Sequence, residues 1–157
     1  MKTDHKIISM SRLTDWRDAM RHQNKRVVVT NGCFDILHIG HVRNLQEARR
    51  RGDVLLVGVN ADETVRQLKG PDRPINSLEH RMEMLAALAC VDFVCSFTEL
   101  RASRFLALTQ PTVYVKGAHG FCDEEKQIVE NSGGKTLLIP ITPGISTSIL
   151  AEKIRQL

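Results

Sequence analysis

The sequence of 157 residues has few aromatic side chains, namely one Trp, one Tyr and five Phe. No stretch alternates basic and aromatic residues, so a platform that stacks the bases of single-stranded nucleic acid is not expected. Basic residues exceed acidic ones only slightly, 22 Lys and Arg against 18 Asp and Glu, and they are spread along the chain. This charge pattern suits an anionic small molecule, and we expect no nucleic-acid partner.

Long apolar runs are also absent. The first ten residues, MKTDHKIISM, lack the apolar centre of a secretory signal, and runs such as VLLVGV are too short to span a bilayer. We therefore expect a cytoplasmic protein that does not bind membranes.

The four cysteines, Cys33, Cys90, Cys95 and Cys122, match no zinc or redox spacing and are expected to be reduced thiols. His119 and Cys122 form an H-x-x-C pair, but no second pair lies nearby in the sequence to close a four-ligand zinc site.

The sequence does contain a regular alternation of apolar strands and amphipathic helices. Strands are predicted at 26–30, 53–60, 91–96, 112–117 and 135–140. Helices are predicted at 41–51, 61–69, 100–108, 123–132 and 146–157, with one more after Ser77, which can cap it. Since the strands are apolar throughout, we predict a Rossmann-like doubly wound α/β fold, with a parallel five-stranded sheet and helices on both faces. We expect a single domain, 1–157, with a leading helical segment, 1–24, and an α/β core, 25–157.

Helical spacing predicts which side chains face the core. Leu13, Trp16 and Met20 share one face of the leading helix. Gly52 follows the helix at 41–51, where a C-terminal cap belongs. The inward positions of other helices are Val42, Leu45 and Ala48 in one, and Leu78, Met82, Leu85 and either Leu88 or Ala89 in another.

The stretch NGCFDILHIGH, 31–41, directly follows the first predicted strand. Parallel sheets bind ligands beyond the carboxyl ends of their strands, and a helix N-terminus attracts anions. Gly40 would let the backbone approach a phosphate, with His38 and His41 donating hydrogen bonds to its oxygens. Neither the P-loop nor the dinucleotide G-x-G-x-x-G pattern is present, so these do not hold the phosphate. Two ordinary packed or surface histidines remain the alternative.

The run TNGCFDILHIGHVRNLQEARRRGD, 30–53, resembles the opening of the cytidylyltransferase-like nucleotidyltransferase superfamily. Together with VNADETVRQLKGPDRPINSLEHRMEMLAALACVDFV, 59–94, it resembles the adenylyltransferase domain of bacterial ADP-heptose synthases. These enzymes join ATP and D-glycero-β-D-manno-heptose 1-phosphate to give ADP-heptose and pyrophosphate. The resemblance covers residues 10–157 and is closest up to residue 98.

The resemblance implies roles for particular residues. His38 and His41 would stabilise the α-phosphate, Lys69 would neutralise phosphate charge, and these three would be catalytic. Arg81 would lie near the polyphosphate. The hydroxyls and amides of GISTS would hold the β- and γ-phosphates through Ser146, Thr147 and Ser148.

Further nucleotide contacts are implied for Gly32, Cys33, Phe34, Asp35, Gly40, Lys116 and Gly117. Asp35 would also contact Mg²⁺, and the acceptor would meet Asn60, Asp62 and His119.

Each of these residues has an ordinary structural alternative. Lys69 could be a solvated loop lysine, Arg81 could pair with Glu79 or Asp92 on the surface, and Asp35 could cap a turn. The Ser-Thr-Ser run could serve only as a helix cap.

The chain departs from the family pattern at VKGAHG, where His119 replaces an expected aspartate, and at TELRAS, where Glu-Thr-Pro is common. Ile141 precedes GIST where glycerol-phosphate cytidylyltransferases carry arginine, which favours ATP over CTP.

Three hypotheses remain: an adenylyltransferase for a sugar 1-phosphate, a cytidylyltransferase for glycerol 3-phosphate or a related alcohol phosphate, and a non-catalytic nucleotide-binding protein. The first implies ATP, Mg²⁺, a separate heptose-phosphate kinase and, by resemblance, a homodimer.

Overall fold

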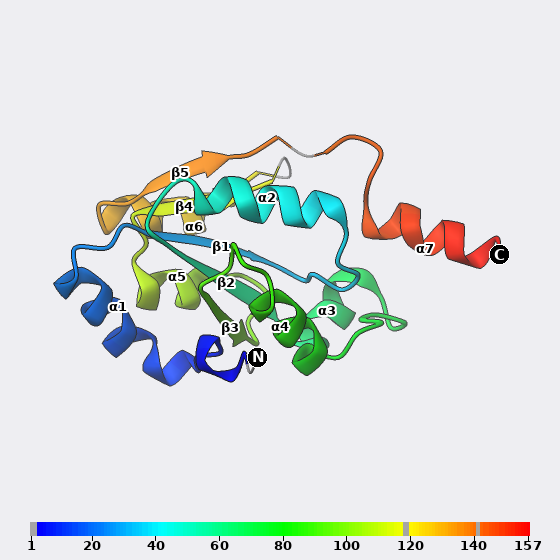
Figure 1. Cartoon of the computed structure of the whole chain (residues 1–157), viewed down its shortest axis with the longest axis horizontal. Coiled ribbons are helices and arrows are strands. Elements are labelled where there is room, and N and C mark those ends of the chain that lie inside the picture. The colour runs from blue at the N-terminus through cyan, green and yellow to red at the C-terminus, as the bar shows by residue number, and fades with distance from the viewer. Residues whose placement is uncertain (1–2, 118–119, 141) are drawn as a thin grey trace.

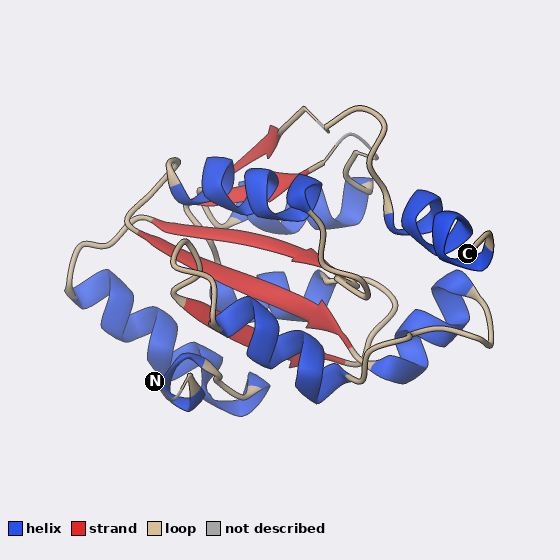
Figure 2. Cartoon of the chain, turned by 45° about the vertical axis from the view of Figure 1, so that its right-hand side comes forward, coloured by secondary structure: helices blue, strands red, loops and turns tan. Residues whose placement is uncertain are grey.

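A computed structural model of the chain describes residues 3–117, 120–140 and 142–157. Its five strands form one parallel sheet in the order β3-β2-β1-β4-β5, with helices on both sides (Figures 1 and 2). This confirms the predicted fold class. The strands are β1 (Val27–Gly32), β2 (Val54–Asn60), β3 (Phe93–Phe97), β4 (Val113–Lys116) and β5 (Lys135–Leu138).

Every predicted helix is present, with bounds that differ by a few residues. The helices are α1 (Leu13–His22), α2 (Ile39–Arg49), α3 (Asp62–Lys69), α4 (Leu78–Ala86), α5 (Ser103–Thr109), α6 (Asp123–Asn131) and α7 (Thr147–Arg155). Two short 3₁₀ helices, Asp4–Lys6 and Met10–Arg12, precede α1. The second predicted helix begins earlier than expected, at Ile39, because the His38 side chain caps it.

The strands are apolar throughout because both faces of the sheet are covered. Along β1, Val27 and Val29 pack with residues of α1, α5 and α6, whereas Val28 packs with residues of α2 and α4. Successive side chains of a strand point to opposite faces, so one continuous apolar run supplies two cores. All seven residues of β2 are buried.

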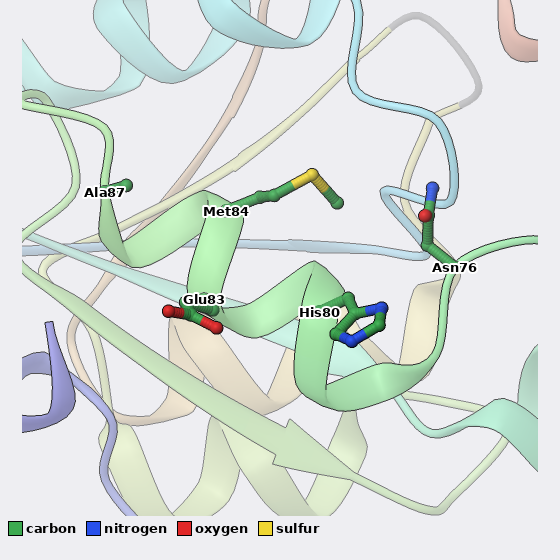
Figure 3. A pocket seen from close by; sticks show the side chains of 5 residues that line it. All are labelled: Asn76, His80, Glu83, Met84 and Ala87. Carbon is green, nitrogen blue, oxygen red and sulfur yellow. The ribbon is translucent and has the colours of Figure 1, made fainter.

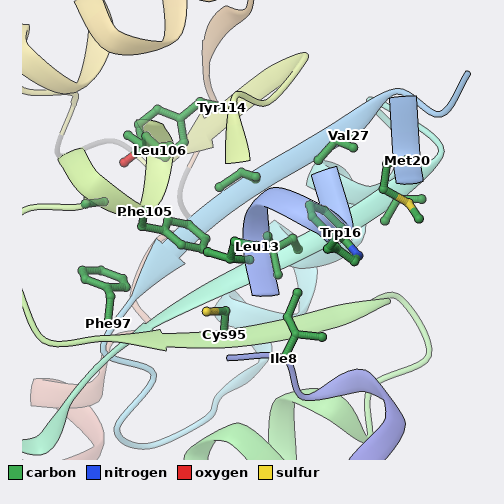
Figure 4. Packing of buried hydrophobic residues seen from close by; sticks show 14 of the residues in the cluster. Ile8, Leu13, Trp16, Met20, Val27, Cys95, Phe97, Phe105, Leu106 and Tyr114 are labelled. Carbon is green, nitrogen blue, oxygen red and sulfur yellow. The ribbon is translucent and has the colours of Figure 1, made fainter. Parts of the chain in front are cut away.

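The leading segment belongs to the first of these cores. Leu13, Trp16 and Met20 of α1 are buried, as predicted, and Ile8 joins them (Figure 4). The Trp16 ring meets Phe93 of β3 edge-on, with 5.4 Å between centroids. The Ile8 amide donates to the Val94 carbonyl at 2.9 Å, which ties the segment to the sheet.

One predicted detail is wrong. Gly52 does not cap α2, whose cap is Arg50; a Cβ at position 52 would lie 2.5 Å from the Arg26 carbonyl oxygen. Gly52 is therefore required for close packing against the start of β1. The prediction that either Leu88 or Ala89 faces inward is confirmed for Leu88, which packs against the core after α4, whereas Ala89 is exposed.

The sheet order places the site. Since β1 lies between β2 and β4, the connections leaving β1 and β4 run in opposite directions and leave a crevice at their carboxyl ends. The last helix, α7, stands beyond these ends and has no buried residue (Figure 1). In the described part of the chain, no helix has the length and apolar content needed to cross a membrane.

Candidate functional site

A pocket of about 1000 Å³ occupies this crevice. Its walls come from the carboxyl ends of β1, β2 and β4, the start of α2, the end of α3 and the start of α7. The predicted site residues that line it are Gly32, Cys33, Phe34, Asp35, His38, Gly40, His41, Asn60, Lys69, Lys116, Gly117, Ser146, Thr147 and Ser148.

The two histidines lie against each other on the wall of this pocket. Their rings stack with 3.7 Å between centroids and 18° between planes. Nδ1 of His38 accepts a hydrogen bond from the His41 amide at 3.3 Å, which caps α2. The proton of a neutral His38 therefore sits on Nε2, leaving that N–H free to donate to a ligand.

Gly40 leaves room for this arrangement. A Cβ there would lie 3.0 Å from both Cε1 and Nδ1 of His38. Any larger residue at position 40 would therefore push the His38 ring away from the helix N-terminus. Phe34 supports the other ring, since it meets His41 edge-on at 5.2 Å.

Both imidazoles are neutral at pH 7 in the free protein. Burial, followed by the neighbouring His38, lowers the pKa of His41 to about 4, with the Ile36 carbonyl acting in the opposite direction. Burial also lowers the pKa of His38. A bound phosphate would reverse this, because a nearby negative charge favours the protonated form.

Among the described residues, the same pocket is lined by four Lys and Arg side chains, namely Lys69, Arg73, Lys116 and Arg155. The two lysines were predicted from the sequence, whereas the two arginines were not. Arg155 follows Ser148 by seven residues, which places both on one face of α7, so helical spacing could have identified it. Arg73 lies in a loop, where no periodicity indicates the direction of a side chain.

Asp35 is occupied by protein donors. Its carboxylate, in a residue only 6% exposed, accepts from Arg73 Nη1 at 2.7 Å and from the amides of Ile75 and Asn76 at 2.7 and 3.0 Å. Both oxygens are therefore committed to the loop after α3. Among the described residues, no group of three or more His, Cys, Asp or Glu could hold a metal ion. These residues do not fit the predicted Mg²⁺ contact at Asp35.

Arg81 lies behind the pocket and not in its wall. Its side chain is fully buried and donates to the carbonyls of Cys33 at 2.5 Å and Asn76 at 3.1 Å, and to Asp62 Oδ1 at 2.7 Å. Neither Arg81 nor Asp62 lines the pocket.

The predicted alternative of a surface pair between Arg81 and Glu79 or Asp92 is wrong. Asp92 pairs with Arg49, at 2.9 Å. Arg81 instead joins the loop after β1 to the start of α4, because burial obliges its guanidinium to find several acceptors.

The start of α7 forms the opposite wall. Ser146 Oγ accepts from the Ile149 amide at 3.2 Å, and the Thr147 hydroxyl donates to the Ile36 carbonyl at 3.5 Å. Ser146 therefore caps α7, as expected if the Ser-Thr-Ser run serves as a helix cap. The same N-terminal turn still faces the pocket through Ser148.

Cys33 and Asn60 meet at the floor of the pocket, with 4.0 Å between Sγ and Oδ1. Burial raises the pKa of Cys33, so it is a neutral thiol. His119 and Ile141 lie outside the described residues, so neither the substituted aspartate nor the position linked to base choice is placed.

A second hollow, of about 420 Å³, lies on the outer face of α4 and is lined by Asn76, His80, Glu83, Met84 and Ala87 (Figure 3). Among the described residues that line it, none is a predicted site residue. These described residues include one histidine and one carboxylate, so they give no excess of positive charge to attract a phosphate.

Comparison with known proteins supports the motif resemblance. Residues 29–154 match the family model described as cytidylyltransferase-like. The bifunctional protein HldE of Geotalea uraniireducens is 45% identical over 156 residues, which is 98% of this chain and 32% of that protein. HldE of Pseudomonas fluorescens is 44% identical over 152 residues, again 32% of its length. The chain thus spans about a third of the curated relatives it matches.

Two solved structures are similar to this chain in fold. The lipopolysaccharide core biosynthesis protein from Thermoplasma volcanium aligns with a TM-score of 0.64 and 27% identity, over 75% of this chain and 97% of its own. A pantoate-beta-alanine ligase from Francisella tularensis, at 16% identity and a TM-score of 0.60 over 96% of this chain and 78% of its own, shares the fold.

Proposed function

The chain belongs to the cytidylyltransferase-like family, and from this premise we propose that it transfers AMP from ATP to a sugar 1-phosphate, releasing pyrophosphate. The proposed acceptor is D-glycero-β-D-manno-heptose 1-phosphate and the product ADP-heptose. The observation that carries the proposal is the stacked pair His38 and His41 at the N-terminus of α2, facing a pocket with four basic side chains.

The reaction requires little proton transfer. A sugar phosphate is already anionic at pH 7, so its oxygen can attack the α-phosphorus without a general base, and the bond to the pyrophosphate oxygen breaks. What the protein must supply is position and positive potential around the α-phosphoryl group. The N–H groups of His38 and His41 would bind its oxygens as charge shifts towards the leaving group.

The pyrophosphate end of ATP would lie between α3 and α7. Lys69 closes α3 and lines the pocket, and Ser146 to Ser148 begin α7 opposite it. The amides at a helix start carry about half a positive charge, so they would stabilise the β- and γ-phosphates as these take up negative charge.

Substrate choice rests on the relatives. The HldE proteins, at about 45% identity over nearly the whole chain, support heptose phosphate as the acceptor and ATP as the donor. Their name says that they are bifunctional, and this chain corresponds to a third of their length. A heptose-phosphate kinase as the source of the acceptor is part of the proposal and rests on the resemblance to the family.

The proposal also includes Mg²⁺, a homodimer and a cytoplasmic location. Mg²⁺ is expected to accompany the triphosphate, whose oxygens are its usual ligands. The homodimer rests on resemblance to the family. A cytoplasmic location agrees with a nucleotide substrate.

The test is pyrophosphate release from ATP or CTP with heptose 1-phosphate or glycerol 3-phosphate. We expect release with ATP and heptose 1-phosphate. Release with CTP and glycerol 3-phosphate would replace the proposal by the cytidylyltransferase alternative. ATP binding without release for any acceptor would favour a non-catalytic nucleotide-binding protein.

Variants connect the activity to the site. His38→Asn and His41→Asn should each lower turnover by roughly 10²- to 10³-fold, as removal of one oxyanion donor does. His80→Asn, in the hollow on α4, is the matched control and should leave turnover unchanged. Equal activity in all three variants would contradict the assignment of the histidines.

A further inference from the structure

Glu125 is a buried carboxylate beneath the pocket. The residue is 3% exposed, yet it accepts from the Ala102 amide at 3.0 Å, from the Tyr114 hydroxyl at 3.1 Å and from Lys116 Nζ at 2.7 Å. Burial raises the pKa of Glu125, but its bonds to Lys116, Ala102 and Tyr114 outweigh burial and leave the pKa below its ordinary value. The carboxylate is therefore ionised.

The neighbours of Glu125 reach the pocket. Lys116, the last residue of β4, lines it directly. Tyr114, fully buried in the core cluster of Figure 4, also lies 2.6 Å from Asn31 Oδ1, and Asn31 lines the pocket as well. One carboxylate thus connects two pocket residues across the β1–β4 boundary.

The Tyr114 hydroxyl has one proton for two oxygen neighbours. Both contacts are satisfied together when the Asn31 amide presents its NH₂ group to the hydroxyl, which then donates to Glu125. Amide orientation is assigned from the hydrogen bonds that it makes. The chain Asn31, Tyr114, Glu125 and Lys116 is then fully paired.

Lysine needs such support if it is to hold a fixed position. Its four-carbon stem is flexible, and ordering it when a ligand binds costs free energy. Lys69, on the other side of the pocket, is exposed and has no carboxylate partner among the described residues. Lys116, in contrast, is held before any ligand arrives.

We propose that Glu125 is a positioning residue that holds the Lys116 ammonium at the pocket wall, so that its remaining protons face the phosphates of the nucleotide. The proposal rests on the proposed function, which supplies the nucleotide. A purely structural role, joining α5 to β4 through Ala102, is the alternative.

The test is a double-mutant cycle on the Kd and KM of ATP, with Glu125→Gln, Lys116→Met and the double variant. Glutamine keeps the shape of the side chain and removes its charge. We expect Glu125→Gln to raise both constants roughly threefold to tenfold, because Lys116 must now be ordered on binding. In the Lys116→Met background the same change should alter them less than twofold. Glu124→Gln, exposed on the same helix, is the matched control and should match the wild type.

Three results would overturn the proposal. Unchanged constants would show that Lys116 needs no anchor. Tighter ATP binding by Glu125→Gln would show that the carboxylate merely neutralises the lysine. An equal effect in both backgrounds would show that Glu125 does not act through Lys116.

Two measures keep the test decisive. Should Glu125→Gln fail to fold, Glu125→Asp replaces it, since a shorter carboxylate cannot reach both Ala102 and Lys116. The cycle on the ATP Kd decides the role of Glu125 even if the wild type releases no pyrophosphate, the outcome that would defeat the proposed function instead.

Discussion

His38 uses one ring nitrogen to cap α2 and leaves the other for a ligand. The stacked His41 shares its wall of the pocket, so each ring limits the motion of the other. Preorganised donors of this kind do not have to be ordered during the reaction, which is what makes them effective on a transferring phosphoryl group. The proposed role of His38 and His41 therefore depends on their close contacts with each other and with the start of α2.

Replacing Gly40 by alanine should separate activity from stability. The new Cβ would press on the His38 ring at 3.0 Å, so turnover should fall at least about tenfold. Stability should be unchanged or higher, since alanine favours a helix over glycine by up to about 1 kcal/mol. Pyrophosphate release measures the turnover of the variant, and thermal unfolding measures its stability. Gln46→Ala, exposed on the same helix, is the control; full activity in Gly40→Ala would contradict the requirement for glycine.

The lowered pKa of His41 should make stability depend on pH. The folded state binds fewer protons than the unfolded state between about pH 6.5 and 4, so the free energy of unfolding should fall as the pH falls through this range. His41→Asn removes this contribution. After allowance for partial exposure, we expect the wild type to lose about 1 kcal/mol more than the variant between pH 7 and 5. Urea unfolding at pH 7 and pH 5 measures the free energy of unfolding of both proteins. An equal loss in the wild type and in His41→Asn would contradict this explanation.

At the scale of elements, two arginines hold the loop between α3 and α4 against the loop after β1. Arg73 pairs with Asp35 at 2.7 Å, and Arg81 bonds to Cys33, Asn76 and Asp62. The loop after β1 ends at His38 and leads into His41 of α2, and the loop between α3 and α4 follows Lys69. Their mutual attachment therefore fixes the distance between two sets of phosphate-binding groups.

Loss of Arg81 should act on stability. Arg81→Met leaves the carbonyls of Cys33 and Asn76 without this donor, while Asp62, whose side chain is 34% exposed, can still reach water. We expect a loss of about 3 kcal/mol in the free energy of unfolding, measured in urea. Arg66→Met, at an exposed position, should cost less than about 0.5 kcal/mol. Unchanged stability with a tenfold higher KM for ATP would instead indicate direct nucleotide binding by Arg81.

Most elements could be predicted because their signals are local. The apolar runs of β1 and β2 and the spacing of Leu13, Trp16 and Met20 contain the information within a few residues. The direction of Arg73 could not be predicted, since a loop has no period. Gly52 was misassigned because a glycine after a helix suits a cap, and only the fold brings Arg26 against it.

At the scale of the whole molecule, the segment 1–24 shares the core of the sheet through Ile8, Leu13, Trp16 and Met20. Its removal would expose the apolar side chains of α5 and β3 that it covers. The division at residue 25 between the leading segment and the α/β core therefore separates parts of the sequence, but the two parts pack in one core.

Deletion of residues 1–24 should abolish cooperative thermal unfolding, followed by circular dichroism. Trp16→Ala alone should lower the free energy of unfolding by about 3 to 5 kcal/mol, because it leaves a large cavity beside Phe93. His22→Ala, exposed at the end of the same helix, serves as control. Cooperative melting of the shortened chain near the wild-type temperature would show that the segment is dispensable.

The sequence by itself determined the order of strands and helices, the parallel sheet and the place of the histidine pair, because these depend on local periodicity and on a motif within eleven residues. Only the tertiary structure decided which charges face the pocket and which lie behind it. Arg81 meets Asp62 across 19 positions and Arg73 meets Asp35 across 38. A buried guanidinium needs acceptors, and here the acceptors lie far away in the sequence. Only the folded chain brings each arginine and its aspartate together.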